Sequence, residues 1–268
     1  ATIASTGSLD AGVLRVIGRV DHAGTVDTTT QLAAFDRGDI RGAVTSDGTA
    51  FWASGTVGSI SSSADAGDAS TIDASAYDLL GGIQYVTLGS TGATTNVTEV
   101  PFNTRVAGIY GTQLFLSSAV TPQNGVSSVG TGVPTTTGQT SVLLAGQAGD
   151  SGSPYGFTMF DQDASVSGLD VLYIADDSTT TKGGGIQKWV NNGTTWTKIA
   201  TFQAGTGYRG VTAQVTSQGI VILATSTETN ANTVVKFLDD GVNLSPTGTV
   251  IATAPTNTAF RGIALGPQ

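Results

Sequence analysis

A short motif that returns at regular intervals constrains the fold of this chain more than any other feature. Tyr208-Arg209-Gly210-Val211-Thr212 returns as Phe260-Arg261-Gly262-Ile263-Ala264, and weaker copies stand at residues 40–44, 106–109 and 154–157. The glycines of the five copies are at positions 42, 108, 156, 210 and 262, so they are 66, 48, 54 and 52 residues apart. From Gly262 through the C-terminus, and on from residue 1 to Gly42, is a further 48 residues. A period near 50 residues that also closes from end to end predicts a ring of repeated units.

Each repeat contains four short runs of β-branched and aromatic residues separated by turn residues, and helical periodicity is nearly absent. The sequence Gly-Gly-Ile-Gln occurs at 81–84 and again at 184–187, which is an independent sign of repetition. In the second copy, residues alternate between two faces of a strand, with Ile186 and Lys188 on one face and Gln187 and Trp189 on the other. We therefore predict an all-β fold, a β-propeller of four-stranded blades. Five repeats are visible, either as a complete ring or as part of a six-bladed one.

The predicted blades belong to one domain over residues 1–268. Their approximate ranges are 260–268 joined with 1–39, then 40–104, 105–153, 154–207 and 208–259. The first blade combines both ends of the chain because residues 13–20 and 24–35 match the third and fourth strands of another blade. Pairing of the N- and C-terminal strands would then close the ring and remove free strand edges. The second strand of this blade must then come from residues 1–10, which are poor strand material. The alternative is therefore the C-terminal part of a longer propeller whose upstream blade is missing. Residues 59–80 are an insertion, a polar loop that we expect to be disordered or decorative.

Composition excludes several classes of function. The chain has no cysteine and a single histidine, His22, which excludes thiolate chemistry and metal sites built from several histidines. Its net charge of −9 argues against nucleic acid and anionic membranes as partners. The sequence contains no apolar run long enough for a transmembrane helix, and we expect no membrane insertion. The chain begins at Ala1 and is rich in Gly, Thr, Ser and Ala, so we expect a processed, extracellular or periplasmic protein.

Arginine at the repeated motif predicts a ligand-binding site. Arg41, Arg209 and Arg261 are three of only seven arginines and share one repeat position, whereas Ala107 and Tyr155 fill the other two. In a propeller, equivalent positions of the innermost strands converge at one rim of the axial channel. Several guanidinium groups there could clamp a carboxylate, phosphate or sulfate. The alternative is that each arginine pairs with local aspartates or carbonyl groups and ties neighbouring blades together.

A second candidate is the densest acidic cluster of the chain, which consists of Asp161, Asp163, Asp170, Asp176 and Asp177. Alternate carboxylates in a loop are suitable Ca²⁺ ligands. The spacing differs from that of an EF-hand, because the central Gly and the distal Glu are missing. The alternative is that these aspartates cap turns and solubilise loops. We expect no cofactor other than this Ca²⁺.

The segment Gly149-Asp150-Ser151-Gly152-Ser153-Pro154 is similar to the sequence around the nucleophilic serine of trypsin-like proteases, and His22 precedes it as that mechanism requires. Two features argue against a protease. The chain lacks the cysteines of that family, and His22 lies in a segment that reads as a hairpin turn.

Three runs of residues carry a wider resemblance: the ending Phe-Arg-Gly-Ile-Ala-Leu, the run Leu-Tyr-Ile-Ala-Asp-Asp and the run Gly-Gly-Ile-Gln-Lys-Trp. They resemble secreted bacterial β-propeller repeat proteins, mostly of uncharacterised function, over about residues 13–268. The resemblance implies the fold and almost nothing about activity. Relatives of this kind continue upstream, which implies that this chain is truncated or processed.

These observations predict a secreted, non-enzymatic scaffold that binds a small anionic or carbohydrate ligand, or a protein. One alternative is an extracellular hydrolase or lyase whose site lies at the channel rim. The other is a filament or surface-layer subunit that assembles by accepting a strand from a neighbour.

Overall fold

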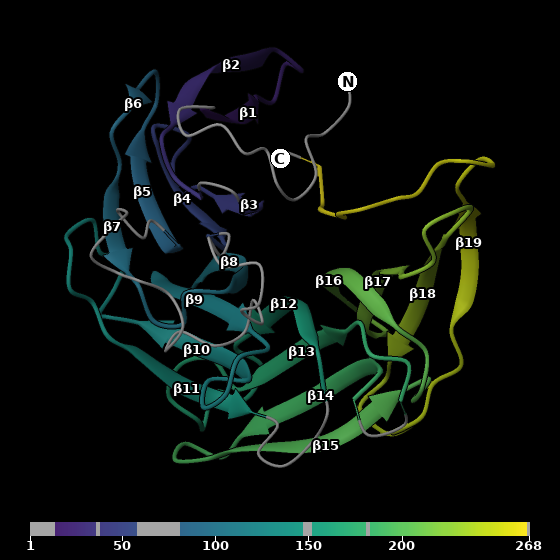
Figure 1. Ribbon diagram of the computed structural model, residues 1–268. Coiled ribbons are helices and arrows are strands. Elements are labelled where there is room, and N and C mark those ends of the chain that lie inside the picture. Colours follow the sequence, from purple (N-terminus) through teal and green to yellow (C-terminus); the bar gives the residue numbers. More distant parts are fainter. Residues whose placement is uncertain (1–13, 36–37, 58–80, 147–151, 181–182, 267–268) are drawn as a thin grey trace. The chain divides into compact units, whose positions relative to one another are not determined.

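The structure of the protein is a computed structural model, and the residues described are 14–35, 38–57, 81–146, 152–180 and 183–266. These residues form 19 β-strands in five sheets and no helix, which confirms the predicted all-β class (Figure 1). In the described ranges, therefore, nothing helical could cross a membrane.

We name the sheets A to E. Sheet A consists of β1 (Arg15–Val20), β2 (Val26–Leu32) and β6 (Thr91–Gly92). Sheet B consists of β3 (Ile40–Val44), β4 (Ala50–Gly55), β5 (Gly82–Thr87) and β7 (Thr95–Thr98). Sheet C consists of β8 (Thr104–Tyr110), β9 (Gln113–Ser118), β10 (Gly125–Val129) and β11 (Ser141–Gly146). Sheet D consists of β12 (Pro154–Phe160), β13 (Val171–Asp176), β14 (Gly185–Asn191) and β15 (Trp196–Phe202). Sheet E consists of β16 (Tyr208–Thr216), β17 (Gly219–Ser226), β18 (Thr233–Asp239) and β19 (Thr249–Thr253).

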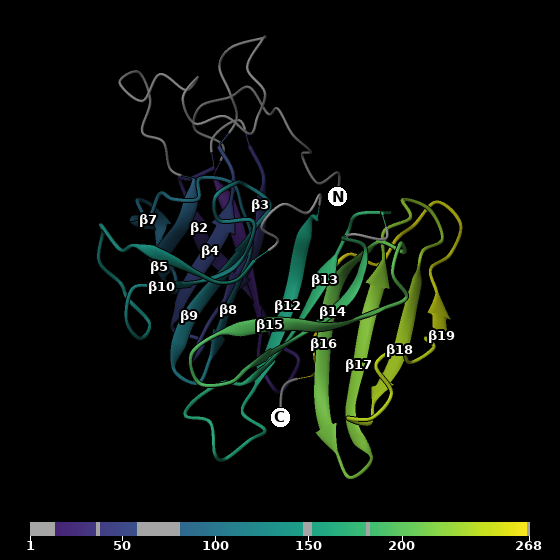
Figure 2. The same ribbon diagram turned by 90° about the horizontal axis from the view of Figure 1, so that it is seen from below.

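Sheets B to E each contain four strands in the order of the sequence, as the repeat predicts. They begin at Ile40, Thr104, Pro154 and Tyr208, whereas the predicted blades begin at 40, 105, 154 and 208. In Figure 2, β16, β17, β18 and β19 lie side by side as such a sheet. In sheets D and E each strand pairs antiparallel with the next along the chain, so these two sheets are meanders. Sheet B differs in that residues 56–81 separate β4 from β5, and β5 pairs with β7.

The two ends of the chain differ from the prediction. Strand β1 pairs with β2, and β2 pairs in parallel with β6, so sheet A takes its third strand from the loop after β5. Residues 260–265 carry the repeated motif but form no strand. Among the described residues, the predicted pairing of the terminal strands is therefore not observed, and no closed ring is detected. The strand expected to join the two ends was assigned to residues 1–10, which lie outside the described residues.

The chain divides into two compact units. Unit 1 comprises residues 1–116, 128–142 and 267–268, and unit 2 comprises residues 117–127 and 143–266. The division passes through strands β9, β10 and β11 of sheet C, and each unit has its own hydrophobic core.

In unit 1, strand β4 is buried on both faces. Phe51 and Ala53 pack with Ile17 and Leu32 of sheet A, whereas Trp52 packs with Leu114 and other residues of sheets B and C. Successive residues of a strand point to opposite faces, so a strand between two other sheets becomes apolar throughout. This explains why the second run of each repeat is continuously apolar in the sequence.

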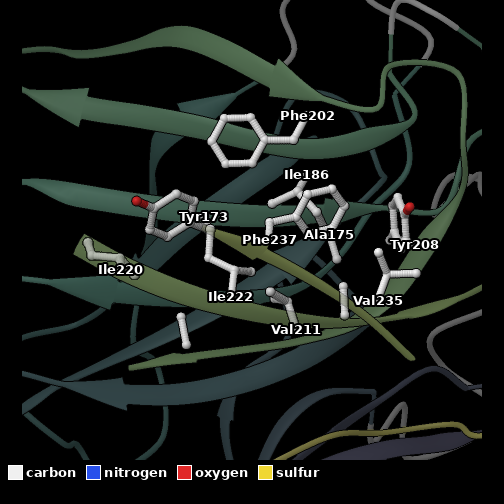
Figure 3. Packing of buried hydrophobic residues seen from close by; sticks show 12 residues of the cluster. Tyr173, Ala175, Ile186, Phe202, Tyr208, Val211, Ile220, Ile222, Val235 and Phe237 are labelled. Atoms are coloured by element: carbon white, nitrogen blue, oxygen red, sulfur yellow. The ribbon is translucent and has the colours of Figure 1, made fainter. Parts of the chain in front are cut away.

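In unit 2, sheets D and E share one apolar core (Figure 3). Tyr173 and Phe202 come from sheet D, and Ile222 and Phe237 come from sheet E, all at 0–1% exposure. The rings of Phe202 and Phe237 are 6.0 Å apart between centroids, within the range of favourable aromatic pairs. Because the four side chains reach in from both sheets, their packing holds sheet D face to face with sheet E.

A buried ionic group joins the same two sheets. Lys188 Nζ of β14 lies 2.6 Å from Asp239 Oδ2 of β18, with side chains that are 11% and 3% exposed. The hydroxyl of Tyr173 donates to the same carboxylate oxygen, and the Gly241 amide donates to Asp239 Oδ1 at 2.9 Å. Burial, reinforced by the carboxylate of Asp239, raises the pKa of Tyr173 well above its ordinary value, so this phenol remains a proton donor. The carboxylate therefore has donors from both sheets.

Asp239→Ala should destabilise unit 2 strongly, because it leaves the Lys188 ammonium buried without its partner. We expect a loss of about 3–5 kcal/mol in the free energy of unfolding, measured by urea denaturation. The double variant Lys188→Met with Asp239→Leu should recover much of the loss. Asp161→Ala, at an exposed site, is the control and should stay within about 0.5 kcal/mol of the parent. A loss in Asp239→Ala no larger than that of this control would contradict the structural role.

Candidate functional site

The arginine of the repeated motif occupies a position that we call the arginine position. One hydrogen bond recurs between consecutive repeats and identifies the residue at this position in each repeat. A hydroxyl near the end of the second strand donates to the backbone oxygen of that residue in the next repeat. Ser54 Oγ donates to Arg105 O at 3.2 Å, and Ser117 Oγ donates to Tyr155 O at 2.5 Å. Thr225 Oγ1 and Arg261 O form the same contact at 3.4 Å. Equivalent acceptors place Arg105, Tyr155 and Arg261 at equivalent positions.

This contact corrects the sequence alignment in sheet C. The predicted occupant of the position was Ala107, because Gly108 follows it, but the structure places Arg105 there. A Cβ built at Gly42 would lie 3.8 Å from Arg105 O and 3.9 Å from Val106 Cα. The sequence comparison missed Arg105 because valine, not glycine, follows it. The signal that could have found it is spacing, since 50 residues separate Arg105 from Tyr155.

In unit 1, Arg41 is held by local partners. Its Nη1 donates to Asn103 Oδ1 and, at 3.3 Å, to Thr104 O, and its Nη2 is 4.0 Å from Asp39 Oδ2. These contacts correspond to the alternative of local pairing, in which the arginine joins two successive repeats.

In unit 2, Arg209 lies between an acid and an aromatic ring. Its Nε and Nη2 donate to Asp177 Oδ2 at 3.2 and 2.9 Å, and its guanidinium carbon is 5.1 Å from the centroid of the Tyr155 ring. The side chains of Arg209 and Asp177 are 31% and 12% exposed. The geometry is that of a cation–π contact combined with a partly exposed ion pair.

Arg261 differs from Arg209 in having no acidic partner among the described residues. In the two sheets, the pair Ala175–Ile186 corresponds to the pair Thr225–Val234, so Thr227 stands where Asp177 stands one repeat earlier. Arg261 is exposed, and no carboxylate of the described residues pairs with it. A single replacement between repeats thus leaves one guanidinium uncompensated.

The positions of Tyr155, Arg209 and Arg261 form a row across unit 2, which we call the arginine edge. A Cβ built at Gly156 would lie 2.7 Å from Arg209 O, and one built at Gly210 would lie 3.3 Å from Arg261 O. The backbones at successive positions are therefore in direct contact. Of the predicted binding set, Tyr155, Arg209 and Arg261 belong to unit 2, whereas Arg41 belongs to unit 1.

The predicted acidic cluster separates into two groups at opposite ends of β13. Asp170 precedes that strand and accepts hydrogen bonds from the amides of Gln162 and Asp163. Asp163 accepts from the Ser165 hydroxyl at 2.6 Å and from its amide at 2.9 Å, and these bonds lower the pKa of Asp163. Asp161 is exposed beside them. This group caps the turn between β12 and β13.

Asp176 and Asp177 lie at the other end of β13, about 20 Å away for a strand of this length. Asp176 Oδ2 accepts from the Ser153 amide at 2.8 Å and from Gln187 Nε2 at 3.0 Å. Asp177 pairs with Arg209. The five aspartates are thus not brought together, and no group of three or more acidic or histidine residues in the described ranges could hold a metal ion.

Two further expectations lie partly or wholly outside the described residues. His22 is exposed in the turn between β1 and β2, where Asp21 N donates to Thr25 O at 3.1 Å. Ser151 falls outside the described residues, so the serine-protease alternative stays untested. The insertion at residues 59–80 also falls outside them.

Comparison of the chain with protein-family models, with curated proteins and with solved structures found no match in any of the three.

The close approach at Gly156 predicts unequal effects of one substitution at two equivalent positions. In Gly156→Ala the new methyl group would meet Arg209 O at 2.7 Å and Val211 N at 3.0 Å, both backbone atoms. We expect a loss of about 1–3 kcal/mol in the free energy of unfolding, measured in urea. At Gly262 a Cβ has nothing within 4 Å, so Gly262→Ala should change stability by less than about 0.5 kcal/mol. Equal effects of the two substitutions would exclude the proposed backbone contact.

Proposed function

We propose that this protein is a secreted, non-enzymatic binding scaffold with a β-propeller fold, and that it binds a small anion at the arginine edge. The candidate anions are carboxylate, phosphate and sulfate groups. A guanidinium group binds each of these with two parallel hydrogen bonds in a fixed plane.

Repetition within each unit supports the propeller. Strand β3 lies beside β8 in unit 1, and β12 lies beside β16 in unit 2, so the first strands of consecutive repeats are neighbours. Sheet B is buried on both faces, and sheets D and E pack face to face. Radial stacking of four-stranded meanders around neighbouring inner strands is the arrangement of propeller blades. The composition of the chain remains the support for a secreted location.

The anion site is supported chiefly by one observation, the exposed Arg261 without an acidic partner. The protein carries a net charge of −9, so an uncompensated cation on it is unusual. Arg209 occupies the adjacent position of the row. Its Nε and Nη2 bind Asp177, whereas its Nη1 takes no part in these hydrogen bonds. Two neighbouring guanidinium groups, one already oriented by Tyr155, offer convergent donors to one anion.

The contacts favour binding over catalysis. A hydrolase or lyase would need an acid or base beside the arginines whose pKa is tuned for proton transfer. Tyr208 is next to Arg209 in the sequence, but burial, together with the charge of Glu228, raises the pKa of Tyr208 to about 12. Its hydroxyl donates to Gln203 Oε1 and stays protonated at neutral pH. Among the described residues, this tyrosine is thus a structural donor.

Binding of inorganic sulfate and phosphate, measured by isothermal titration calorimetry at low ionic strength, tests the proposal. Arg261→Ala should weaken binding by about tenfold or more, because a charge-assisted hydrogen bond contributes about 1.5–3 kcal/mol. Thr227→Asp should also weaken it, since it supplies the carboxylate that Asp177 supplies to Arg209. Asp177→Ala should strengthen it by releasing Arg209.

Lys236→Ala is the matched control, because it removes one exposed positive charge from the same unit, on β18 and outside the arginine edge. It should leave anion affinity within about twofold of the parent. An equal loss in Lys236→Ala and Arg261→Ala would indicate a general charge effect, and unchanged affinity in Arg261→Ala would exclude the site.

A further inference from the structure

Residues 260–265 occupy the place of the first strand of a further repeat. Phe260 N donates to Asn232 Oδ1 at 2.7 Å, and Phe260 O accepts from Asn232 Nδ2 at 2.8 Å. Arg261 O receives the Thr225 hydroxyl at 3.4 Å. A Cβ at Gly210 would lie 3.3 Å from both Arg261 O and Ile263 N. The last of these contacts is the one by which β16 itself meets β12, since a Cβ at Gly156 would lie 2.7 Å from Arg209 O and 3.0 Å from Val211 N.

The segment differs from its equivalents in having no second strand. β3 pairs with β4, β12 with β13, and β16 with β17, each in antiparallel register. Residues 260–265 form no ladder with any strand of the described chain. Arg261, Gly262, Ala264 and Leu265 are exposed, Leu265 at 48%. Asn232 and Thr225 bind the backbone of Phe260 and Arg261, but the backbone groups of residues 262–265 make no hydrogen bond within the described chain. A run of backbone amides and carbonyls without partners is a template for another strand.

We propose that residues 260–265 accept a β-strand from another polypeptide chain, which completes the repeat by β-augmentation. This inference does not depend on anion binding at the arginine edge. The chemistry of the partner strand is defined by the chain itself. Four of its sheets contain a second strand, and these strands show which residue types are accommodated beside a first strand. They are β4, β9, β13 and β17, each a run of bulky apolar residues that ends in small, hydroxyl or acidic side chains.

The free face of sheet E would cover one side of the incoming strand. In sheet D the cross-strand pairs Val171–Val190, Tyr173–Lys188 and Ala175–Ile186 face sheet E. The equivalent pairs of sheet E are Val221–Leu238, Leu223–Lys236 and Thr225–Val234. They point away from the core shared with sheet D, and no other sheet of unit 2 packs on them. The aliphatic side chains of this face are all half-buried, which suits a flat apolar contact. They are Val221, Leu223, Val234 and Leu238.

The register of the bound strand follows from β16 and β17. Gly210, Val211, Thr212 and Ala213 lie opposite Thr225, Ala224, Leu223 and Ile222. By equivalence, Gly262, Ile263, Ala264 and Leu265 would lie opposite the same four residues of a donor with the β17 sequence. Ala264 would therefore face the residue that corresponds to Leu223.

A synthetic peptide with the sequence of residues 218–227, extended by two lysines for solubility, is the probe. Fluorescence anisotropy of the labelled peptide should show saturable binding to the full chain with one site, and a scrambled peptide should bind at least tenfold more weakly. Ala264→Pro should weaken binding by about tenfold, because a lost backbone hydrogen bond and a disturbed strand remove about 1.4 kcal/mol. Ile251→Pro is the control on β19, the exposed edge strand of sheet E, and should leave affinity unchanged.

Cross-linking tests the register without relying on affinity. The chain has no cysteine, so Ala264→Cys provides a single thiol. A peptide with cysteine at the position of Leu223 should form a disulfide with it, whereas peptides with cysteine at the positions of Ile222 or Ala224 should not, because those side chains point to the opposite face. Absence of saturable binding, as expected if the chain's own residues fill the edge, would overturn the proposal. Cross-linking at Ile251→Cys in preference to Ala264→Cys would overturn it as well.

Discussion

Direct contact between the backbones of successive first strands is the constraint on which the rest of the structure depends. At Gly156 the space for a side chain is already occupied by Arg209 O, 2.7 Å from where a Cβ would lie. At this position of the repeated motif, glycine is thus required by a neighbouring strand, not by a turn. Because the backbones touch there, the residue before each glycine is fixed beside its counterpart in the next repeat. The row of Tyr155, Arg209 and Arg261 is a consequence of this packing.

The sequence predicts most of the strands because strand burial leaves a direct trace in residue type. β4 and β13 lie between two apolar layers and are continuously apolar, whereas β14 alternates as predicted from Ile186 to Trp189. Contacts that depend on a partner in another sheet leave no such trace. The group formed by Lys188, Asp239 and Tyr173 spans 66 residues of sequence, and nothing local marks Lys188 as buried.

Only part of the candidate site was predicted, because a motif in the sequence shows repeated positions but not contacts between sheets. Arg209 and Tyr155 were found because they share a motif position, but the motif depended on glycine and missed Arg105, where valine follows. Density of aspartates in the sequence suggested one calcium site, yet a straight strand separates Asp170 from Asp176 by its whole length. Residues near each other along an extended strand are far apart in space, so sequence clustering is a weak guide to a shared site in a β protein.

In a repeat protein, residues that differ between equivalent positions give one repeat a property that the others lack. Asp177 neutralises the arginine of the following repeat, and its replacement by Thr227 leaves Arg261 charged and exposed. Lys188 is buried against Asp239, whereas its equivalent Lys236 is exposed on a face that no other sheet of unit 2 covers. Both differences fall at the last repeat of the chain, beside residues 260–265. An arginine on an unpaired strand also opposes the pairing of two identical edges, because like charges placed opposite each other are destabilising.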